Sequence, residues 1–266
     1  LEFRRVLFRS SLTGLEPGTV YHVRAYATNA IGTSYGANAS FTTAGSNGTW
    51  IAHGGGSWSH TPNWQGGVDA SGADGTADFS QVTPASDAIV TLDGPRSIGG
   101  LVFGNPAFNH NWILAPGSGG SLTLDIGISG DPAITVNGGG VIAGTVLLGT
   151  DGLVKSGAGS LTLAAANSYT GLTTVTAGTL NITGSLSAGS PVAVGAGGTL
   201  SGTGTLGSHL AVTGTLAHGE SGTGTLEVKG NVTLSGTAAM EIHQSAATCD
   251  RITGSNSIAY GGTLAV

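Results

Sequence analysis

The chain has 266 residues, only 8% of them are charged, and the formal net charge is −6 at pH 7. Ordinary globular domains carry about 25% charged residues, and nucleic-acid binding requires clustered Lys and Arg, so this balance excludes a nucleic-acid partner. The 49 glycines disfavour helix and follow no three-residue collagen period, while 39% apolar residues argue against disorder. We therefore predict an all-β protein with many tight turns.

The cysteine count and the hydropathy further limit the class of protein. Cys249 is the single cysteine, so an internal disulfide is impossible. No apolar run reaches the roughly 18 residues that a membrane-spanning helix requires. We find no signal peptide, and we interpret both chain ends as truncated, which leaves the secretion route and the anchor open.

The N-terminal part divides into two pieces. Residues 1–10, LEFRRVLFRS, differ from all that follows, and we interpret them as a non-native segment. Within residues 11–45, YHVRAYA alternates as a strand, NAIG turns the chain, and ASFTT forms a second strand. The phrase LEPGTVY, with Leu15, Pro17, Thr19 and Tyr21, resembles the tyrosine corner of fibronectin type III domains. That resemblance implies a partial domain, a truncated hairpin that acts as a spacer or binding module.

After a linker at residues 44–48, short apolar runs recur between glycine-rich turns. The tripeptide GTL begins at positions 178, 198, 204, 214, 224 and 262. The first interval is about 20 residues, which is the length of one coil of a β-helix, a fold in which each coil buries its apolar side chains against its neighbours. We therefore expect a parallel β-helix, or solenoid, over residues 46–266, with parallel strands from about residue 122 onward.

The core of this region carries a family resemblance. Residues 152–182 read GLVKSGAGSLTLAAANSYTGLTTVTAGTLNI and resemble the autotransporter-associated β-strand repeat, with Lys155, Asn167 and Tyr169 among the matching positions. The resemblance, with its flanks, covers about residues 48–266. It implies a β-helix of autotransporter-passenger type in an extracellular, outer-membrane or cell-surface protein of a bacterium.

Two short motifs fit catalytic or cofactor patterns. GTSYG at 32–36 fits the nucleophile elbow around Ser34, but that elbow needs a following helix, and another strand follows here. GTGTLG at 202–207 fits a dinucleotide loop, but such a site needs a following helix and no helical pattern follows. We interpret both motifs as turns.

The segment after the linker holds other candidates for chemistry. His53 and His60 lie near three tryptophans and precede three aspartates; these are Trp50, Trp58, Trp64, Asp69, Asp74 and Asp78. The irregular spacing favours aspartates that cap turns over a cation site. We expect the tryptophans to cover the open end of the β-helix, with stacking on sugar rings as the alternative. Tyr169 is interpreted as turn packing, and His218 is given no function.

Two hypotheses of different class remain. The first is a non-enzymatic structural or adhesion protein, with polysaccharide or the surface of a host or neighbouring cell as partner. The second is a polysaccharide lyase or hydrolase on a β-helix, which needs convergent carboxylates near a base. Because residues 156–208 hold no acid, base or histidine, we predict no catalytic, cofactor-binding or metal-binding residues, no cofactor and no enzymatic activity. The oligomeric state stays open.

Strand alternation also predicts which side chains are buried. In the central repeat we expect a buried set, Leu161, Leu163, Val175, Leu180 and Ile182, and a largely exposed set, Thr162, Thr174 and Asn181.

Overall fold

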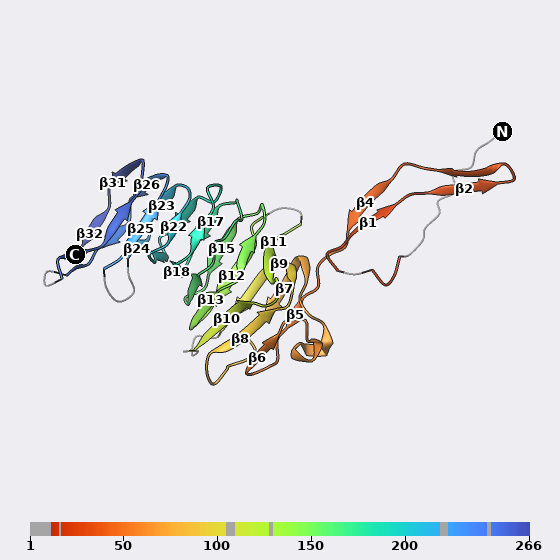
Figure 1. Ribbon diagram of the computed structural model, residues 1–266, viewed down its shortest axis with the longest axis horizontal. Coiled ribbons are helices and arrows are strands. Elements are labelled where there is room, and N and C mark those ends of the chain that lie inside the picture. Colours follow the sequence, from red (N-terminus) through yellow and green to blue (C-terminus); the bar gives the residue numbers. More distant parts are fainter. Residues whose placement is uncertain (1–11, 16, 105–109, 128–129, 219–222, 244–245) are drawn as a thin grey trace.

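The protein is a stack of β-coils from which an antiparallel hairpin projects at the N-terminal end (Figure 1). The computed structural model describes residues 12–15, 17–104, 110–127, 130–218, 223–243 and 246–266. Its helices are two short 3-10 turns, η1 (Thr61–Asn63) and η2 (Gln65–Gly67), and all its other regular elements are strands. The predicted all-β class and the β-helix of autotransporter-passenger type are confirmed.

Each coil contributes to up to three parallel sheets, which we call faces 1, 2 and 3. Face 1 has ten strands, which run in order along the stack. They are β6 (Gly55–Ser57), β8 (Ala88–Leu92), β10 (Asn111–Pro116), β13 (Gly140–Ala143), β16 (Ser160–Leu163), β18 (Gly178–Ile182), β21 (Gly198–Ser201), β24 (Thr215–Ala217), β27 (Thr237–Ala239) and β32 (Thr263–Ala265). Because every neighbouring pair is parallel and in register, each strand obtains its hydrogen bonds from the coils on either side.

Face 2 follows the same order on a second side of the stack. Its strands are β5 (Gly48–Thr49), β7 (Gly72–Asp78), β9 (Pro95–Phe103), β12 (Ala133–Val136), β15 (Leu153–Ser156), β17 (Thr173–Val175), β20 (Val192–Val194), β23 (Leu210–Val212), β26 (Asn231–Leu234) and β31 (Ser257–Tyr260). The parallel stack therefore begins near residue 48, well before the predicted start at about residue 122.

Face 3 is the least regular. Its strands are the first half of β9, β11 (Ser121–Leu124), β14 (Val146–Leu148), β19 (Ser185–Leu186), β22 (Thr205–Leu206), β25 (Thr225–Val228) and β30 (Arg251–Thr253). The long strand β9 serves two faces, because Pro95–Ile98 pairs with β11 while Gly100–Phe103 pairs with β12. One antiparallel hairpin, β28 (Ile242–His243) with β29 (Thr248–Cys249), interrupts the last coils.

The repeat length read from the GTL tripeptides agrees with the register. Leu161, Leu180, Leu200 and Leu216 stack in one inward column of face 1. The GTL tripeptides at 178, 198, 214 and 262 all lie on face 1, whereas those at 204 and 224 lie on face 3. The three short GTL intervals, 198–204, 204–214 and 214–224, therefore separate strands on different faces of the stack.

The core is apolar and runs from the first coil to the last but one. All five predicted core residues of the central repeat, Leu161, Leu163, Val175, Leu180 and Ile182, are fully buried. The predicted exposed set is wrong: Thr162 and Thr174 are half-buried, and Asn181 is only 7% exposed. In a stacked solenoid each outward side chain is flanked by its counterparts one coil before and after, here Thr162 and Ser201 around Asn181, so strand alternation overestimates the exposure.

The N-terminal hairpin is a two-stranded ribbon in two segments. The strands β1 (Val20–Val23) and β4 (Ala39–Thr42) pair at its base, and β2 (Tyr26–Asn29) and β3 (Gly32–Tyr35) pair at its tip. Most of its described side chains are exposed. Tyr21 stacks on Phe41, and Arg24 lies over the ring of Tyr35. The hairpin joins the first coil through backbone bonds from Gly45 to Ala73 and between Ser46 and Ser71.

Candidate binding face and the fate of the catalytic candidates

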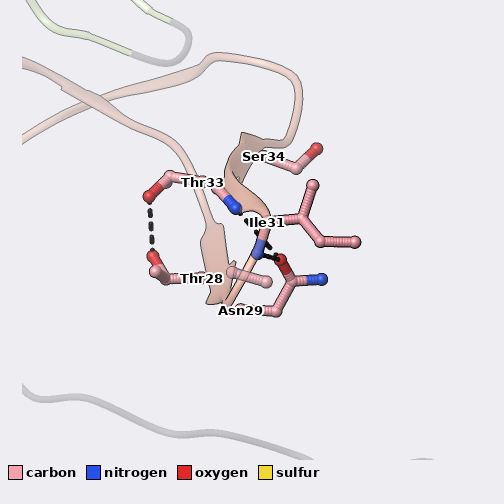
Figure 2. A pocket seen from close by; sticks show the side chains of 7 residues that line it. Thr28, Asn29, Ile31, Thr33 and Ser34 are labelled. Atoms are coloured by element: carbon pink, nitrogen blue, oxygen red, sulfur yellow. Dashed lines mark hydrogen bonds between the residues drawn. The ribbon is translucent and has the colours of Figure 1, made fainter.

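Ser34 lies at the tip of the hairpin, in β3, where the chain has just turned back (Figure 2). The Asn29 side chain accepts hydrogen bonds from the Ile31 and Gly32 amides and so forms the turn. In Figure 2 the Ser34 hydroxyl points away from the Thr28–Thr33 hydroxyl pair, whose oxygens lie 2.8 Å apart. The strand β4 follows instead of a helix, so the geometry of a nucleophile elbow is absent from this described segment.

A hollow of about 400 Å³ lies against this tip, lined by Ala27, Thr28, Asn29, Ile31, Gly32, Thr33 and Ser34. The described lining contains hydroxyl, amide and aliphatic groups but no acid or base. It can offer hydrogen bonds to a ligand, and it provides no group for proton transfer.

The GTGTLG segment at 202–207 is a turn followed by β22. Gly202 has a φ of 109°, in the region that favours glycine. The amide of Gly204 donates to the carbonyl of Ile182 in the preceding coil. The segment thus occupies the corner between faces 1 and 3, and a strand follows where a dinucleotide site needs a helix.

The tryptophans form a buried cluster at the N-terminal end of the stack. Trp50, Trp58 and Trp64 are at most 1% exposed, and their indole N–H groups donate to the carbonyls of Ala52, Ala70 and Trp58 respectively. Phe79 lies at the centre of the cluster and contacts five rings, those of the three tryptophans, Phe103 and Trp112. Buried ring faces cannot stack on a sugar, so this geometry supports the end-capping interpretation over the sugar-stacking one.

The histidines and aspartates around this cluster do not gather at one point. His53 and His60 are exposed. Asp69 pairs with Arg96 at 2.9 Å, and Asp78 accepts the amide of Ser80 at 2.8 Å. Within the described part of the chain, no group of three or more His, Cys, Asp or Glu side chains is arranged to hold a metal ion.

Most of the other aspartates accept backbone amides from a neighbouring coil. Asp131 accepts from Gly152, Asp151 from Ile126, and Asp250 from both Gly224 and Glu241. Two exposed carboxyls also accept hydrogen bonds from another coil: those from Asn111 lower the pKa of Asp87, and those from the Ser57 and Ser59 hydroxyls lower the pKa of Asp93. These acids are used as caps that hold successive coils together.

One hollow does bring two acids together. Asp74 and Asp131 both line a space of about 290 Å³ over the outer surfaces of β7, β9 and β12. The remaining lining is Thr76, Gly99, Gly100, Leu101, Val102, Ile126, Ala133 and Thr135. No lysine, arginine or histidine is among these residues, so the base required by the enzyme hypothesis is missing from the described lining.

The residues of the central repeat that match the family pattern, among them Lys155, stabilise the fold. Lys155 points into the core of the stack, where its column neighbours on face 2 are Ile134 and Val175. Its ammonium group donates to the carbonyls of Ser156, Gly157 and Ala177 at 2.9–3.0 Å. Burial lowers its pKa to about 8, so the group is still mainly charged at neutral pH and all three of its N–H donors have acceptors.

The Asn167 side chain supplies hydrogen bonds where the strand pairing of face 3 is interrupted. Between β14 and β19 the coil forms only an isolated bridge, Ala166 with Ser185. The Asn167 amide oxygen accepts from the Leu147 amide, and its nitrogen donates to the Ala165 and Ser185 carbonyls, so one side chain replaces the missing ladder bonds.

Tyr169 belongs to a chain of hydrogen-bonded hydroxyl groups inside the stack. Its hydroxyl lies 2.7 Å from that of Thr173, which lies 3.0 Å from that of Ser190. Burial raises the pKa of Tyr169 to about 12. His218 is also buried, and burial lowers its pKa.

The outer surface of face 1 is the most regular polar surface of the described chain. One hydroxyl-bearing residue from each of six successive strands stands in register with the next; the set, which we call the hydroxyl row, is Ser160, Thr179, Thr199, Thr215, Thr237 and Thr263. Two positions further along the strands lies a second row, Thr162, Asn181 and Ser201. Sequence reasoning found the GTL repeat but missed this face, because strand register decides which GTL threonines share it.

A hollow extends the hydroxyl row toward the N-terminal coils. Gly140 stands between Asn111 and Ser160 in the same register, and the missing side chain leaves a space of about 400 Å³. Its lining includes Asn111, Ser160 and Thr162. A Cβ on Gly140 would lie 2.3 Å from the Asn111 side-chain oxygen, so close packing with Asn111 requires glycine here.

Comparisons with known proteins agree with this architecture. Residues 153–182 match the family model described as Passenger-associated-transport-repeat. The chain is 36% identical over 232 residues to the Adhesin BmaC autotransporter of Brucella suis biovar 1 (strain 1330), an alignment that covers 82% of this chain and 6% of that protein. No solved structure matches. None of the described helices is long and apolar enough to cross a membrane. The chain therefore carries a passenger-associated repeat within a β-helix and is distantly homologous to a small part of an autotransporter adhesin.

Proposed function

We propose that this chain is a length of a secreted or surface-displayed bacterial adhesin, in which the β-helix is a rigid, non-enzymatic stalk whose outer faces contact other surfaces. One observation carries the proposal: a single apolar core runs through parallel coils, while the described ionisable groups of the coils largely cap backbone amides or carbonyls. The similarity to an autotransporter adhesin supports the same function.

Within this proposal the N-terminal hairpin, residues 11–45, is a spacer of fibronectin type III character. The Thr19 hydroxyl donates to the Pro17 carbonyl, and Tyr21 stacks on Phe41, so the residues of the LEPGTVY phrase are used in local packing. Within the same proposal, the β-helical region spans residues 46–266.

The test is adhesion by the whole chain. Fluorescent beads coated with the purified protein are incubated with bacterial cells, with yeast cells and with bare polystyrene, next to albumin-coated beads. The proposal predicts retention on at least one cell type well above albumin. Retention no greater than albumin on every surface would contradict it.

A second candidate, a polysaccharide lyase or hydrolase, is favoured by one observation, the shared hollow of Asp74 and Asp131. Release of new sugar ends from a polysaccharide, abolished by Asp74→Asn or Asp131→Asn, would establish that function in place of the first.

A further inference from the structure

The outer surface of face 1 has the chemistry of a carbohydrate-binding surface. We propose that the hydroxyl row binds a neutral, extended polysaccharide chain that lies along the axis of the β-helix. This inference rests on the proposed adhesive function and gives it a surface and a ligand class.

The hydroxyls of the row have no hydrogen-bonding role inside the described part of the protein. Among the described residues, the hydroxyls of the row make no hydrogen bond to another residue. Threonines elsewhere do: Thr176 donates to the carbonyl of Lys155, Thr213 to that of Val194, and Thr145 to that of Gly120. The row is therefore a line of free donors and acceptors, while other threonines, both the buried Thr145 and the exposed Thr176 and Thr213, are bonded within the fold.

The neighbouring row contains buried polar atoms that lack a partner. Asn181 and Ser201 are 7% and 5% exposed, yet the Asn181 amide oxygen and the Ser201 hydroxyl have no hydrogen-bond partner. A buried polar atom without a partner is destabilising by about 1–3 kcal/mol. Because these atoms lie beside the hydroxyl row, in register with Thr162, a ligand seated on the row would lie next to unfilled hydrogen-bonding positions.

The strands of face 1 carry no charged side chains. None of the ten strands of face 1 contains Asp, Glu, Lys or Arg. An anionic polymer requires basic residues on the surface that binds it. Protein interfaces are enriched in aromatic residues, Met and Arg, and the outward positions of face 1 carry none of these. A neutral polymer of hydroxyl groups matches what the face presents.

The length of the hydroxyl row suits an extended polymer. Successive strands lie about 4.8 Å apart, so the six members of the row span about 24 Å. The Gly140 hollow, with Asn111 and Ser160 in its lining, extends the face beyond Ser160. A long polymer can contact many of these groups at once, so that weak single contacts add up to stable retention.

The test removes hydroxyls without changing shape. Thr199→Val with Thr215→Val deletes two adjacent hydroxyls of the row, and Val is a good strand residue of the same shape. The matched control, Thr174→Val with Thr233→Val, makes the same changes at outward positions of face 2. All three proteins are sedimented with insoluble cellulose, chitin, β-1,3-glucan and starch, and their thermal unfolding is compared.

The inference predicts that the unmodified chain binds at least one of these glycans, that the face 1 variant binds about tenfold more weakly, and that the control binds as the parent does. Equal binding by all three proteins, or equal loss in both variants, would overturn it. Adhesion to cells without binding to any neutral glycan would overturn the ligand class and leave the adhesive function standing. So would adhesion that is lost after the target cells are treated with protease, because it would show a protein partner.

Discussion

Lys155 offers the sharpest test of how the central repeat is held together, because a charged group stands in an otherwise apolar column. Replacing it with Met keeps the length of the side chain and removes the three charge-assisted hydrogen bonds to Ser156, Gly157 and Ala177. Such bonds contribute about 1.5–3 kcal/mol each, or about 4.5–9 kcal/mol in total.

An opposing term comes from burial of the charge. A pKa lowered from 10.5 to about 8 corresponds to a desolvation cost of about 3 kcal/mol, which the Met variant no longer bears. The net expectation is that Lys155→Met lowers the free energy of unfolding by about 1–6 kcal/mol in urea denaturation. Lys229→Met, at an exposed position, should change it by less than about 0.5 kcal/mol. A Lys155→Met protein as stable as the parent would show that the three contacts make no net contribution.

The same group gives a pH dependence with a definite sign. The folded pKa, about 8, lies below the unfolded value of 10.5, so between these values the unfolded chain binds more protons than the folded one. The stability of the parent relative to Lys155→Met should therefore rise as the pH increases from about 8 to 10.5. If the stability of the parent relative to Lys155→Met fell between about pH 8 and 10.5, the burial of a charged lysine would be contradicted.

The packing of two buried side chains and the exposure of the hairpin give three further predictions. Leu163→Ala truncates a fully buried side chain and should lower the free energy of unfolding by about 2–5 kcal/mol; an unchanged urea midpoint would count against the register. Phe79→Ala removes the centre of the aromatic cluster and should lower it by about 3–5 kcal/mol, read from thermal unfolding, and an unaltered melting temperature would refute the capping role. Limited proteolysis should remove residues 1–43 at or before the 44–48 segment and leave the remainder folded, since most of the described hairpin is exposed; loss of the whole fold on cleavage there would place the domain boundary elsewhere.

The inward half of the architecture could be predicted from the sequence. The spacing of Leu180 and Leu200 within GTL tripeptides predicts coils of about 20 residues, and these leucines do stack. Alternation identified the buried residues of β16, β17 and β18 because an apolar side chain can be satisfied only in the core. The β-helical region was expected from residue 46, but its parallel strands only from about residue 122, because Gly48–Thr49 and Gly55–Ser57 carry no apolar pattern and are held by backbone pairing.

The outer half depends on register, which composition does not reveal. The exposure of Asn181 was predicted wrongly because its flanking residues Thr162 and Ser201 come from coils about 20 positions away. The hydroxyl row was missed for the same reason: Thr205 and Thr225 share the GTL tripeptide with Thr199 and Thr215 but lie on face 3. The roles of Lys155 and Asn167 became clear only when the carbonyls and amides of adjacent coils were placed beside them.

The most direct test of the central claim is one assay that measures binding and turnover together. The whole chain is incubated with a panel of neutral and acidic polysaccharides, and both the retained protein and the newly released reducing ends are quantified, with Asp74→Asn and Asp131→Asn in parallel. We predict that the protein is retained on a neutral glycan and that this retention is insensitive to salt. None of the three proteins should release reducing ends. Turnover by the parent that either substitution abolishes would contradict it.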